Sequence, residues 1–330
     1  MRFPAVAAAS GSKCLKPILL GALCLCGATT DVLTAYTRRQ PGPRYLASTA
    51  VLLTECSKLF AALTALLVLS GGSLPRLSTV LVTDGPREAL RILVPASLYA
   101  VQNNLYYYAL TNLDPATYTV TVQLKIFTTA VFMRTLLDVR ITRGQWAALS
   151  VLFSGVCLVQ LSPGLLPHRD PAGGSLAAGL SAMVVICIIS GFSGVYFEKL
   201  LKHSTVPFWV RNLQMYVLGT MAAGVTCLGG DWAKIREQGF FLGYTHAVWA
   251  LIALSAGSGI TVSLVMRHLD NLHKTLGASV SIVMATGAMA ILFHASPGPG
   301  FLAGAGLVML AVFLYNYPLD RPTEHAELPR

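Results

Sequence analysis

Ten apolar stretches follow one another along this chain of 330 residues, each near the roughly 20 residues that a helix needs to cross a membrane. Lipid offers the backbone no hydrogen-bonding partner, so apolar stretches of this length form helices there. Charged residues make up only 12% of the chain, against about a quarter in a soluble domain. The sequence therefore predicts an all-α membrane protein with ten transmembrane helices, at residues 15–36, 46–70, 89–111, 114–137, 143–162, 174–202, 206–229, 244–268, 273–294 and 299–317.

A break rich in proline and glycine lies between the fifth and sixth stretches and divides the chain into halves. Five helices in each half give the halves opposite orientations in the membrane, so a similarity between them is an inverted repeat, a common transporter architecture. Lysine and arginine are more frequent in the loops on the side of both termini, which indicates cytosolic termini. The predicted organisation is a cytosolic N-terminus at 1–14, halves at 15–162 and 174–317, a connecting loop at 163–173 and a cytosolic tail at 318–330.

Two lysines stand out among the polar residues of these stretches. Lys125 lies in the middle of its predicted helix, with no acidic residue at helical spacing in that helix. A charge inside a membrane helix is costly and normally faces a cavity or a ligand. Lys274 has a comparable place in the second half, just after the turn Leu269-Asp270, which repeats the Leu113-Asp114 turn of the first half. In an inverted repeat the two lysines can converge on one site, and two ammonium groups suit phosphate oxygens.

Aromatic and amide side chains in the same stretches suit the rest of a nucleotide. Tyr99, Tyr118 and Tyr216 offer ring faces to a flat base, and Asn103 and Asn212 offer paired donors and acceptors. Tyrosines near helix ends can equally serve as anchors at the membrane interface. The polar residues together indicate an anionic, nucleotide-like ligand.

Several other classes of function are disfavoured. The net charge of +10 comes from basic residues that fall singly between apolar runs, without the clustered basic face of a nucleic-acid-binding protein. The seven cysteines show no C-x-x-C pair and no metal-type spacing. No nucleophile and base arrangement and no ATP-binding loop occurs. We therefore expect neither an enzyme nor a cofactor, a metal or a nucleic-acid partner.

Seven segments, in order along the chain, resemble Golgi nucleotide-sugar transporters of the branch that handles CMP-sialic acid, UDP-galactose and UDP-N-acetylglucosamine. These segments are Tyr99–Asn104, Ala109–Tyr118, Gln123–Ile126, Gly191–Lys199, Trp209–Tyr216, Gly239–Tyr244 and Asp270–Asn271. The resemblance implies the drug/metabolite transporter fold, with ten helices in inverted five-helix repeats and cytosolic termini. It also implies exchange of a cytosolic nucleotide sugar for a lumenal nucleoside monophosphate across the Golgi membrane, with the endoplasmic reticulum as the alternative location.

The resemblance also implies a set of ligand-binding positions. By that similarity the two lysines meet the phosphates, while the amides and tyrosines hold the pyrimidine and ribose. The implied substrate-binding residues are Tyr99, Asn103, Tyr118, Lys125, Ser190, Asn212, Tyr216, Ser263 and Lys274. Gly191 and Gly194 correspond to glycines that pack helices near the site.

The substrate is less well determined, because the chain departs from the family pattern. Thr119 and Val122 stand where the family usually has a glutamine and a tyrosine. Ser263 and the segment from Asn212 to Tyr216 look more like CMP-sialic acid transporters, whereas Asn104-Leu105 and Ala116–Tyr118 look more like UDP-sugar transporters. We predict an antiporter of UDP-galactose or UDP-N-acetylglucosamine. The alternatives are a CMP-sialic acid:CMP antiporter and a non-transporting membrane scaffold for glycosyltransferases.

The expected partners follow from this prediction. They are a nucleotide sugar, a nucleoside monophosphate and the lipid bilayer. A second copy of the chain and glycosyltransferases are further candidates.

Overall fold

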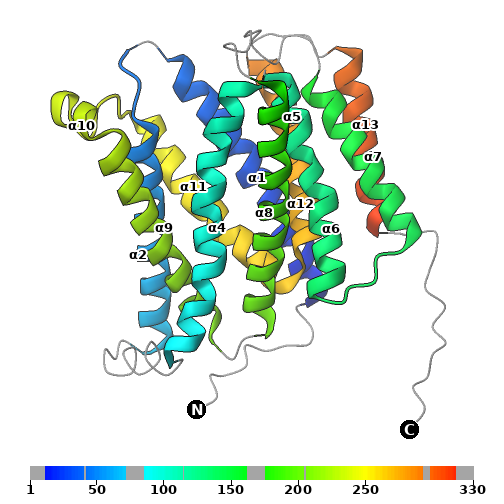
Figure 1. Ribbon diagram of the computed structural model, residues 1–330, viewed down its shortest axis with the longest axis horizontal. Coiled ribbons are helices and arrows are strands. Elements are labelled where there is room, and N and C mark those ends of the chain that lie inside the picture. The colour runs from blue at the N-terminus through cyan, green and yellow to red at the C-terminus, as the bar shows by residue number, and fades with distance from the viewer. Residues whose placement is uncertain are drawn as a thin grey trace.

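A computed structural model describes residues 12–40, 42–71, 85–113, 115–161, 175–203, 206–292 and 298–316. Within these ranges every regular element is a helix. The start of α1 (Ser12–Arg39) and the end of α13 (Pro299–Asn316) lie toward the same end of the bundle (Figure 1). The predicted connecting loop at 163–173 and tail at 318–330, and all but residues 12–14 of the predicted N-terminal segment, lie outside the described residues.

Helices occupy each of the predicted stretches. Their bounds are α2 Ala47–Leu69, α4 Gly85–Asn112, α5 Pro115–Thr121, η1 Val122–Leu124, α6 Lys125–Leu136, α7 Arg143–Gln160, α8 Leu176–His203, α9 Phe208–Gly230, α10 Trp232–Gln238, α11 His246–His268 and α12 Asn271–Leu292. Among the described residues, seven helices are long and apolar enough to cross a membrane, namely α1, α2, α8, α9, α11, α12 and α13. The protein is therefore a multi-pass membrane protein. That α4, α5–η1–α6 and α7 also span the membrane, and that the halves form an inverted repeat, remain predictions.

The predicted helix 114–137 is interrupted, which sequence periodicity did not indicate. A short 3₁₀ segment, η1, separates α5 from α6 directly before Lys125. The interruption begins at the end of a run of β-branched residues from Thr119 to Val122, which have a low helix propensity. The thiol of Cys187 in α8 lies 3.5 Å from the carbonyl oxygen of Thr121 and 3.8 Å from that of Val122, and it donates to both. A 3₁₀ turn inside a helix often marks a functional site.

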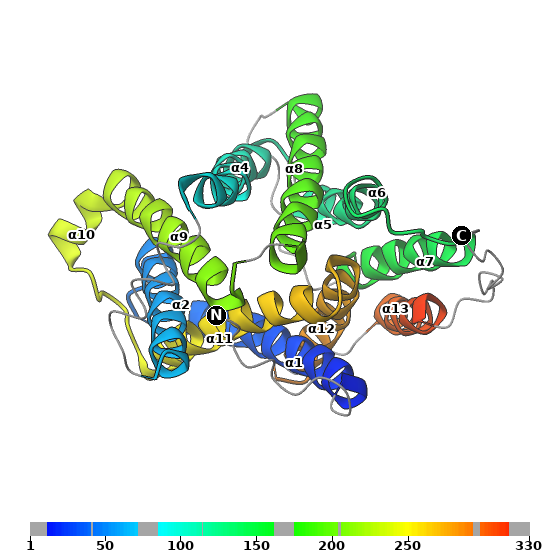
Figure 2. The same ribbon diagram turned by 90° about the horizontal axis from the view of Figure 1, so that it is seen from below.

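Helices of the two sequence halves pack mainly on each other. α1 packs on α11 and α12, α2 on α9, α4 on α8, and α7 on α13. Seen from the end of the bundle, α7 and α13 lie at one edge and α2 and α10 at the opposite edge (Figure 2). Gly155 and Gly304 allow the close approach of α7 and α13, because a Cβ on Gly304 would lie 2.7 Å from the carbonyl oxygen of Gly155. Neither half therefore completes its packing without the other.

The largest apolar cluster holds the two lysine-bearing helices in place. Ile126 of α6 and Leu272 of α12 are fully buried in it, together with Leu152, Val195 and Val308. Ile126 directly follows Lys125, and Leu272 lies two residues before Lys274. Leu152, Val195 and Val308 lie on helices that pack against α6 or α12. Lipid supplies no hydrophobic driving force between helices, so close van der Waals packing of such side chains holds them together. The backbones that carry Lys125 and Lys274 are thus anchored by the core.

Candidate functional site

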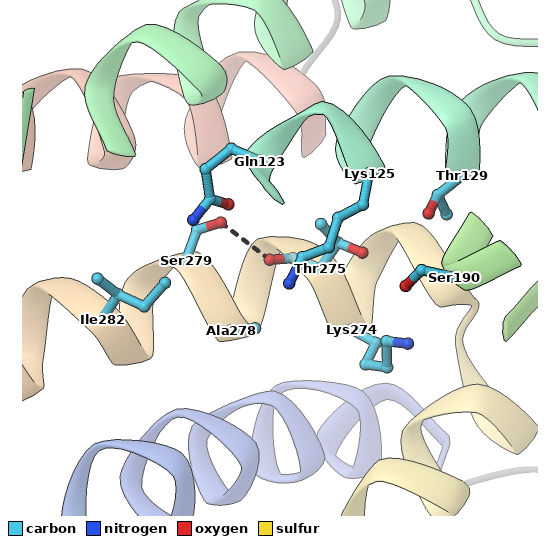
Figure 3. A pocket seen from close by; sticks show the side chains of 9 residues that line it. All are labelled: Gln123, Lys125, Thr129, Ser190, Lys274, Thr275, Ala278, Ser279 and Ile282. Atoms are coloured by element: carbon cyan, nitrogen blue, oxygen red, sulfur yellow. Dashed lines mark hydrogen bonds between the residues drawn. The ribbon is translucent and has the colours of Figure 1, made fainter. Parts of the chain in front are cut away.

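A cavity of about 100 Å³ lies between α6, α8 and α12 (Figure 3). Most of its lining side chains are polar, in a region where the surrounding helices are apolar. The lining residues are Gln123, Lys125, Thr129, Ser190, Lys274, Thr275, Ala278, Ser279 and Ile282. Three of the predicted site residues, Lys125, Ser190 and Lys274, are therefore brought together here.

Both lysines are half-buried at this cavity. Lys125 is the first residue of α6, and its side chain extends toward α12 (Figure 3). Lys274 comes from the first turns of α12. Within the described ranges neither lysine forms an ion pair, and the two ammonium groups are close enough to repel each other. An anionic ligand would relieve this repulsion and offset the cost of two buried charges.

Lys274 is the fourth residue of α12, in the first turn, whose backbone N–H groups donate to the carboxylates of Glu198 and Asp270. Thr275 and Ser279 follow on the cavity side, and the hydroxyl of Ser279 donates to the carbonyl oxygen of Thr275 at 3.0 Å. The hydroxyl of Thr275 likewise donates to the carbonyl oxygen of Asn271 at 2.9 Å, so the groups at this cavity that suit a phosphate-sized anion are the two ammonium groups.

Gly191 and Gly194 let α8 approach both lysine-bearing helices. A Cβ on Gly191 would lie 2.9 Å from the backbone nitrogen of Thr129 in α6. A Cβ on Gly194 would lie 2.6 Å from the side-chain nitrogen of Asn271 in α12. Both glycines therefore pack helices next to the cavity, at the positions that the family resemblance indicates.

A second polar cluster gathers Tyr216, Ser263 and an ion pair on α2. Glu55 and Lys58 of α2 are 2.6 Å apart, as their spacing on one helix face predicts. The Lys58 ammonium lies 5.2 Å from the centre of the Tyr216 ring, and the Tyr216 hydroxyl lies near that of Ser263. A Cβ on Gly259 in α11 would lie 2.8 Å from Cδ of Lys58. This cluster therefore sits between α2, α9 and α11 and is distinct from the lining of the lysine cavity.

Asn212 lies one helical turn before Tyr216 on α9. It is fully buried, and its amide nitrogen donates to the carbonyl oxygen of Phe208 at 2.9 Å. Its side-chain oxygen has no hydrogen-bond partner among the described residues. A buried polar atom without a partner is costly, so a donor that reached this oxygen would relieve that cost.

The remaining predicted residues lie on α4 and α5. Tyr118 packs edge-on against Tyr106, with ring centres 6.1 Å apart, and Tyr99 is half-buried in α4. Val122, like Tyr106 and Tyr118, packs against the apolar cluster between α4 and α8. Val122 does not line the lysine cavity. The side chain of Asn103, like that of Thr119, lies outside the described part.

Comparison with known proteins identifies the family. The family model described as "Nucleotide-sugar transporter" matches residues 11–316. The chain is 40% identical over 307 residues to the UDP-galactose translocator of Mus musculus, which covers 92% of this chain and 79% of that protein. The chain belongs to the nucleotide-sugar transporter family. The resemblance carried by the seven sequence segments is thus confirmed.

Two further similarities extend this result. The nucleotide-sugar transporter described here is 37% identical over 322 residues to the UDP-N-acetylglucosamine transporter of Homo sapiens, covering 94% of this chain and 98% of that protein. A solved crystal structure shares the fold at 14% identity, with a TM-score of 0.66 over 91% of this chain and 96% of that one. Members of the family are transporters, which fits the expectation that this chain is a carrier and not an enzyme.

Sequence reasoning missed several residues that line the cavity of this nucleotide-sugar transporter. Gln123, Thr129, Thr275 and Ser279 line the cavity, although none of them is among the predicted substrate-binding residues. A signal was present on α12, because Lys274, Thr275 and Ser279 are polar residues in a helix that is long and apolar enough to cross a membrane. The spacing of Thr275 and Ser279 places them one turn apart on one face.

Proposed function

We propose that this nucleotide-sugar transporter is an antiporter. It carries UDP-galactose or UDP-N-acetylglucosamine from the cytosol into the Golgi lumen and returns a nucleoside monophosphate by alternating access. Both termini face the cytosol. The observation that supports this most strongly is that Lys125 and Lys274, one from each sequence half, line one cavity without an ion-pair partner among the described residues.

The phosphates of the substrate bind between the two ammonium groups. Ser190 adds a hydroxyl to the same cavity from α8. The base and ribose reach toward Asn212, Tyr216 and Ser263, because these residues hold a buried amide oxygen and two neighbouring hydroxyls. The remaining proposed contacts, at the α4 and α5 side, are Tyr99, Asn103 and Tyr118.

The size of the cavity supports alternating access. A volume of about 100 Å³ holds a phosphate-sized group, whereas sites for larger organic ligands measure about 300–1,000 Å³. A nucleotide sugar therefore needs α6, α8 and α12 to separate. Rocking of one part of the bundle against the other, as in many transporters built from repeats, provides this space on one side of the membrane at a time.

Charge explains why the transport is an exchange. In the empty carrier both ammonium groups line the cavity without an ion-pair partner among the described residues. Closing the bundle around them is costly because like charges repel strongly at low dielectric. Bound phosphate neutralises them and lowers this cost. A nucleotide sugar and a nucleoside monophosphate share the phosphate, so both allow the carrier to reorient.

The printed names of the relatives favour UDP-sugars. The two described above are a UDP-galactose translocator and a UDP-N-acetylglucosamine transporter. A preference of the purified protein for UMP over CMP supports this proposal. A preference for CMP would replace it with CMP-sialic acid exchange, and stabilisation by no nucleotide would support a scaffold that carries nothing.

The substitution Lys125→Ala tests the phosphate role. We expect uptake of UDP-galactose or UDP-N-acetylglucosamine into proteoliposomes preloaded with UMP to fall about 10- to 100-fold, because a hydrogen bond to a charged group contributes about 1.5–3 kcal/mol. The matched control is Lys234→Ala, which removes an exposed lysine of α10 and leaves uptake unchanged. Normal exchange by a folded Lys125→Ala protein would refute the phosphate role.

A further inference from the structure

One face of α8 contacts both helices that carry the lysines. Gly191 lies against α6, and Gly194, one turn later, lies against Asn271 of α12. Glu198 follows at the next turn on this face. It is fully buried, which is rare for a carboxylate unless it is paired. This carboxylate is therefore expected to have specific partners.

The carboxylate of Glu198 caps the start of α12. Its Oε2 atom accepts a hydrogen bond from the backbone nitrogen of Asn271 at 2.8 Å. Asn271 is the first residue of α12, and the first N–H groups of a helix have no partner within the helix. A carboxylate at this end also interacts favourably with the helix dipole. Glu198 thus ties the N-terminus of α12 to α8.

Neighbouring contacts hold the same turn. Lys202 of α8 lies 2.6 Å from Oε1 of Glu198 and donates to the carbonyl oxygen of Leu269, at the end of α11. Asp270 accepts a hydrogen bond from the backbone nitrogen of His273 at 2.7 Å. The backbone that leads from α11 into α12 is therefore held by hydrogen bonds to Glu198 and Lys202 of α8 and by a local hydrogen bond to Asp270.

We propose that Glu198 is a positioning residue for the phosphate site and acts through Lys274. Lys274 lies three residues after Asn271, less than one helical turn from the capped N–H. Because α8 also contacts α6 through Gly191, the Glu198 cap sets where Lys274 stands relative to Lys125. Lys202 pairs with Glu198 at 2.6 Å, so the carboxylate that caps α12 already has a cation partner on its own helix.

The substitution Glu198→Gln tests this inference, which rests on the proposed phosphate site. The probes are UMP, which carries a phosphate, and uridine, which does not, with the full-length protein in lipid nanodiscs. We expect the Kd of UMP to rise about tenfold, equivalent to ~1.4 kcal/mol, while that of uridine stays within about twofold. Glu237→Gln, at an exposed position on α10, is the control and leaves both values unchanged. A general loss of structure would weaken both ligands equally and would overturn the proposal.

A double-mutant cycle separates action through Lys274 from a direct effect. Residues that act as a unit give non-additive effects. Glu198→Gln should therefore add no loss of UMP affinity in a Lys274→Ala background and should keep its full effect in a Lys125→Ala background. Additive losses with Lys274→Ala would overturn the proposal.

A second variant covers the case in which Glu198→Gln does not fold. Gly194→Ala displaces Asn271 by contact and without a change of charge, so it should weaken UMP more than uridine in the same way. Equal weakening of both ligands would overturn the inference. If the wild-type protein binds neither ligand, the proposed function itself fails. If the wild type binds UMP through Lys274 and Glu198→Gln leaves the Kd unchanged, this inference alone fails.

Discussion

The contact of α8 with α6 leads to a quantitative prediction for Gly191→Ala. The new Cβ would lie 2.9 Å from the carbonyl carbon of Thr128 and 2.9 Å from the backbone nitrogen of Thr129. Backbone atoms cannot rotate away, so the two helices must separate by ~0.5 Å to reach ordinary van der Waals distance. Overpacking of this kind costs ~1–3 kcal/mol, and the higher helix propensity of alanine offsets ~1 kcal/mol of it.

The expected net destabilisation is thus ~0–2 kcal/mol, which lowers the Tm by up to several degrees for a chain of this size. The same separation moves α6 and Lys125 away from α12, so the affinity for UMP should fall as well. Both quantities can be measured by thermal unfolding of purified protein with and without UMP.

Gly257→Ala provides the matched control. Nothing lies within 4 Å of a Cβ at Gly257, so this substitution should leave the Tm unchanged or raise it, and UMP should stabilise it as it stabilises the wild type. The reasoning would be refuted if Gly191→Ala had a Tm and a UMP response equal to those of Gly257→Ala.

Two further predictions concern the loops beside α10. Gly243 has a φ of +69°, and a Cβ there would collide with the carbonyl oxygen of Pro43. Gly239 also has a positive φ, but no described atom lies within 4 Å of a Cβ there. Gly243→Ala should therefore lower the Tm more than Gly239→Ala; equal losses would contradict the contact with Pro43. The Ser48 hydroxyl donates to Asp231 at 2.7 Å and holds the pKa of that carboxyl below its usual range. A carboxyl with a lowered pKa stabilises the fold above the usual aspartate pKa of about 4, and this stabilisation is lost as the pH falls below that value. Ser48→Ala should therefore lower the Tm at pH 7, with a difference from the wild type that shrinks as the pH falls below about 4; a constant difference would argue against the ionic contribution.

Much of the helical layout could be predicted because it depends on local properties. The length and apolarity of each stretch predict a helix, because a single segment in lipid can satisfy its backbone hydrogen bonds only as a helix. The structure has helices at each of these stretches. The Thr142-x-x-Gln145 pattern before α7 is likewise local, and both of its reciprocal hydrogen bonds are present. The interruption at η1 was not predicted; the β-branched run at its start is local, but the thiol of Cys187, which donates to the carbonyl oxygens of Thr121 and Val122, comes from α8.

The candidate site could be predicted only in part. An unpaired lysine within an apolar helix is visible in the sequence, so Lys125 and Lys274 were identified on energetic grounds. The family segments indicated Asn212, Tyr216 and Ser263, yet nothing local shows that Tyr216 and Ser263 gather at Glu55 and Lys58 of α2 and not at the lysine cavity.

The sequence by itself determined that this chain is a helical membrane protein of the nucleotide-sugar transporter family with two costly lysines inside apolar stretches. Only the tertiary structure decided that the lysines share one cavity, which residues surround them and that Glu198 caps the helix of Lys274. The physical reason is sequence separation. Apolarity and helix signals act over a few residues, whereas Glu198 and Asn271 are 73 residues apart in the chain and meet only when α8 and α12 pack.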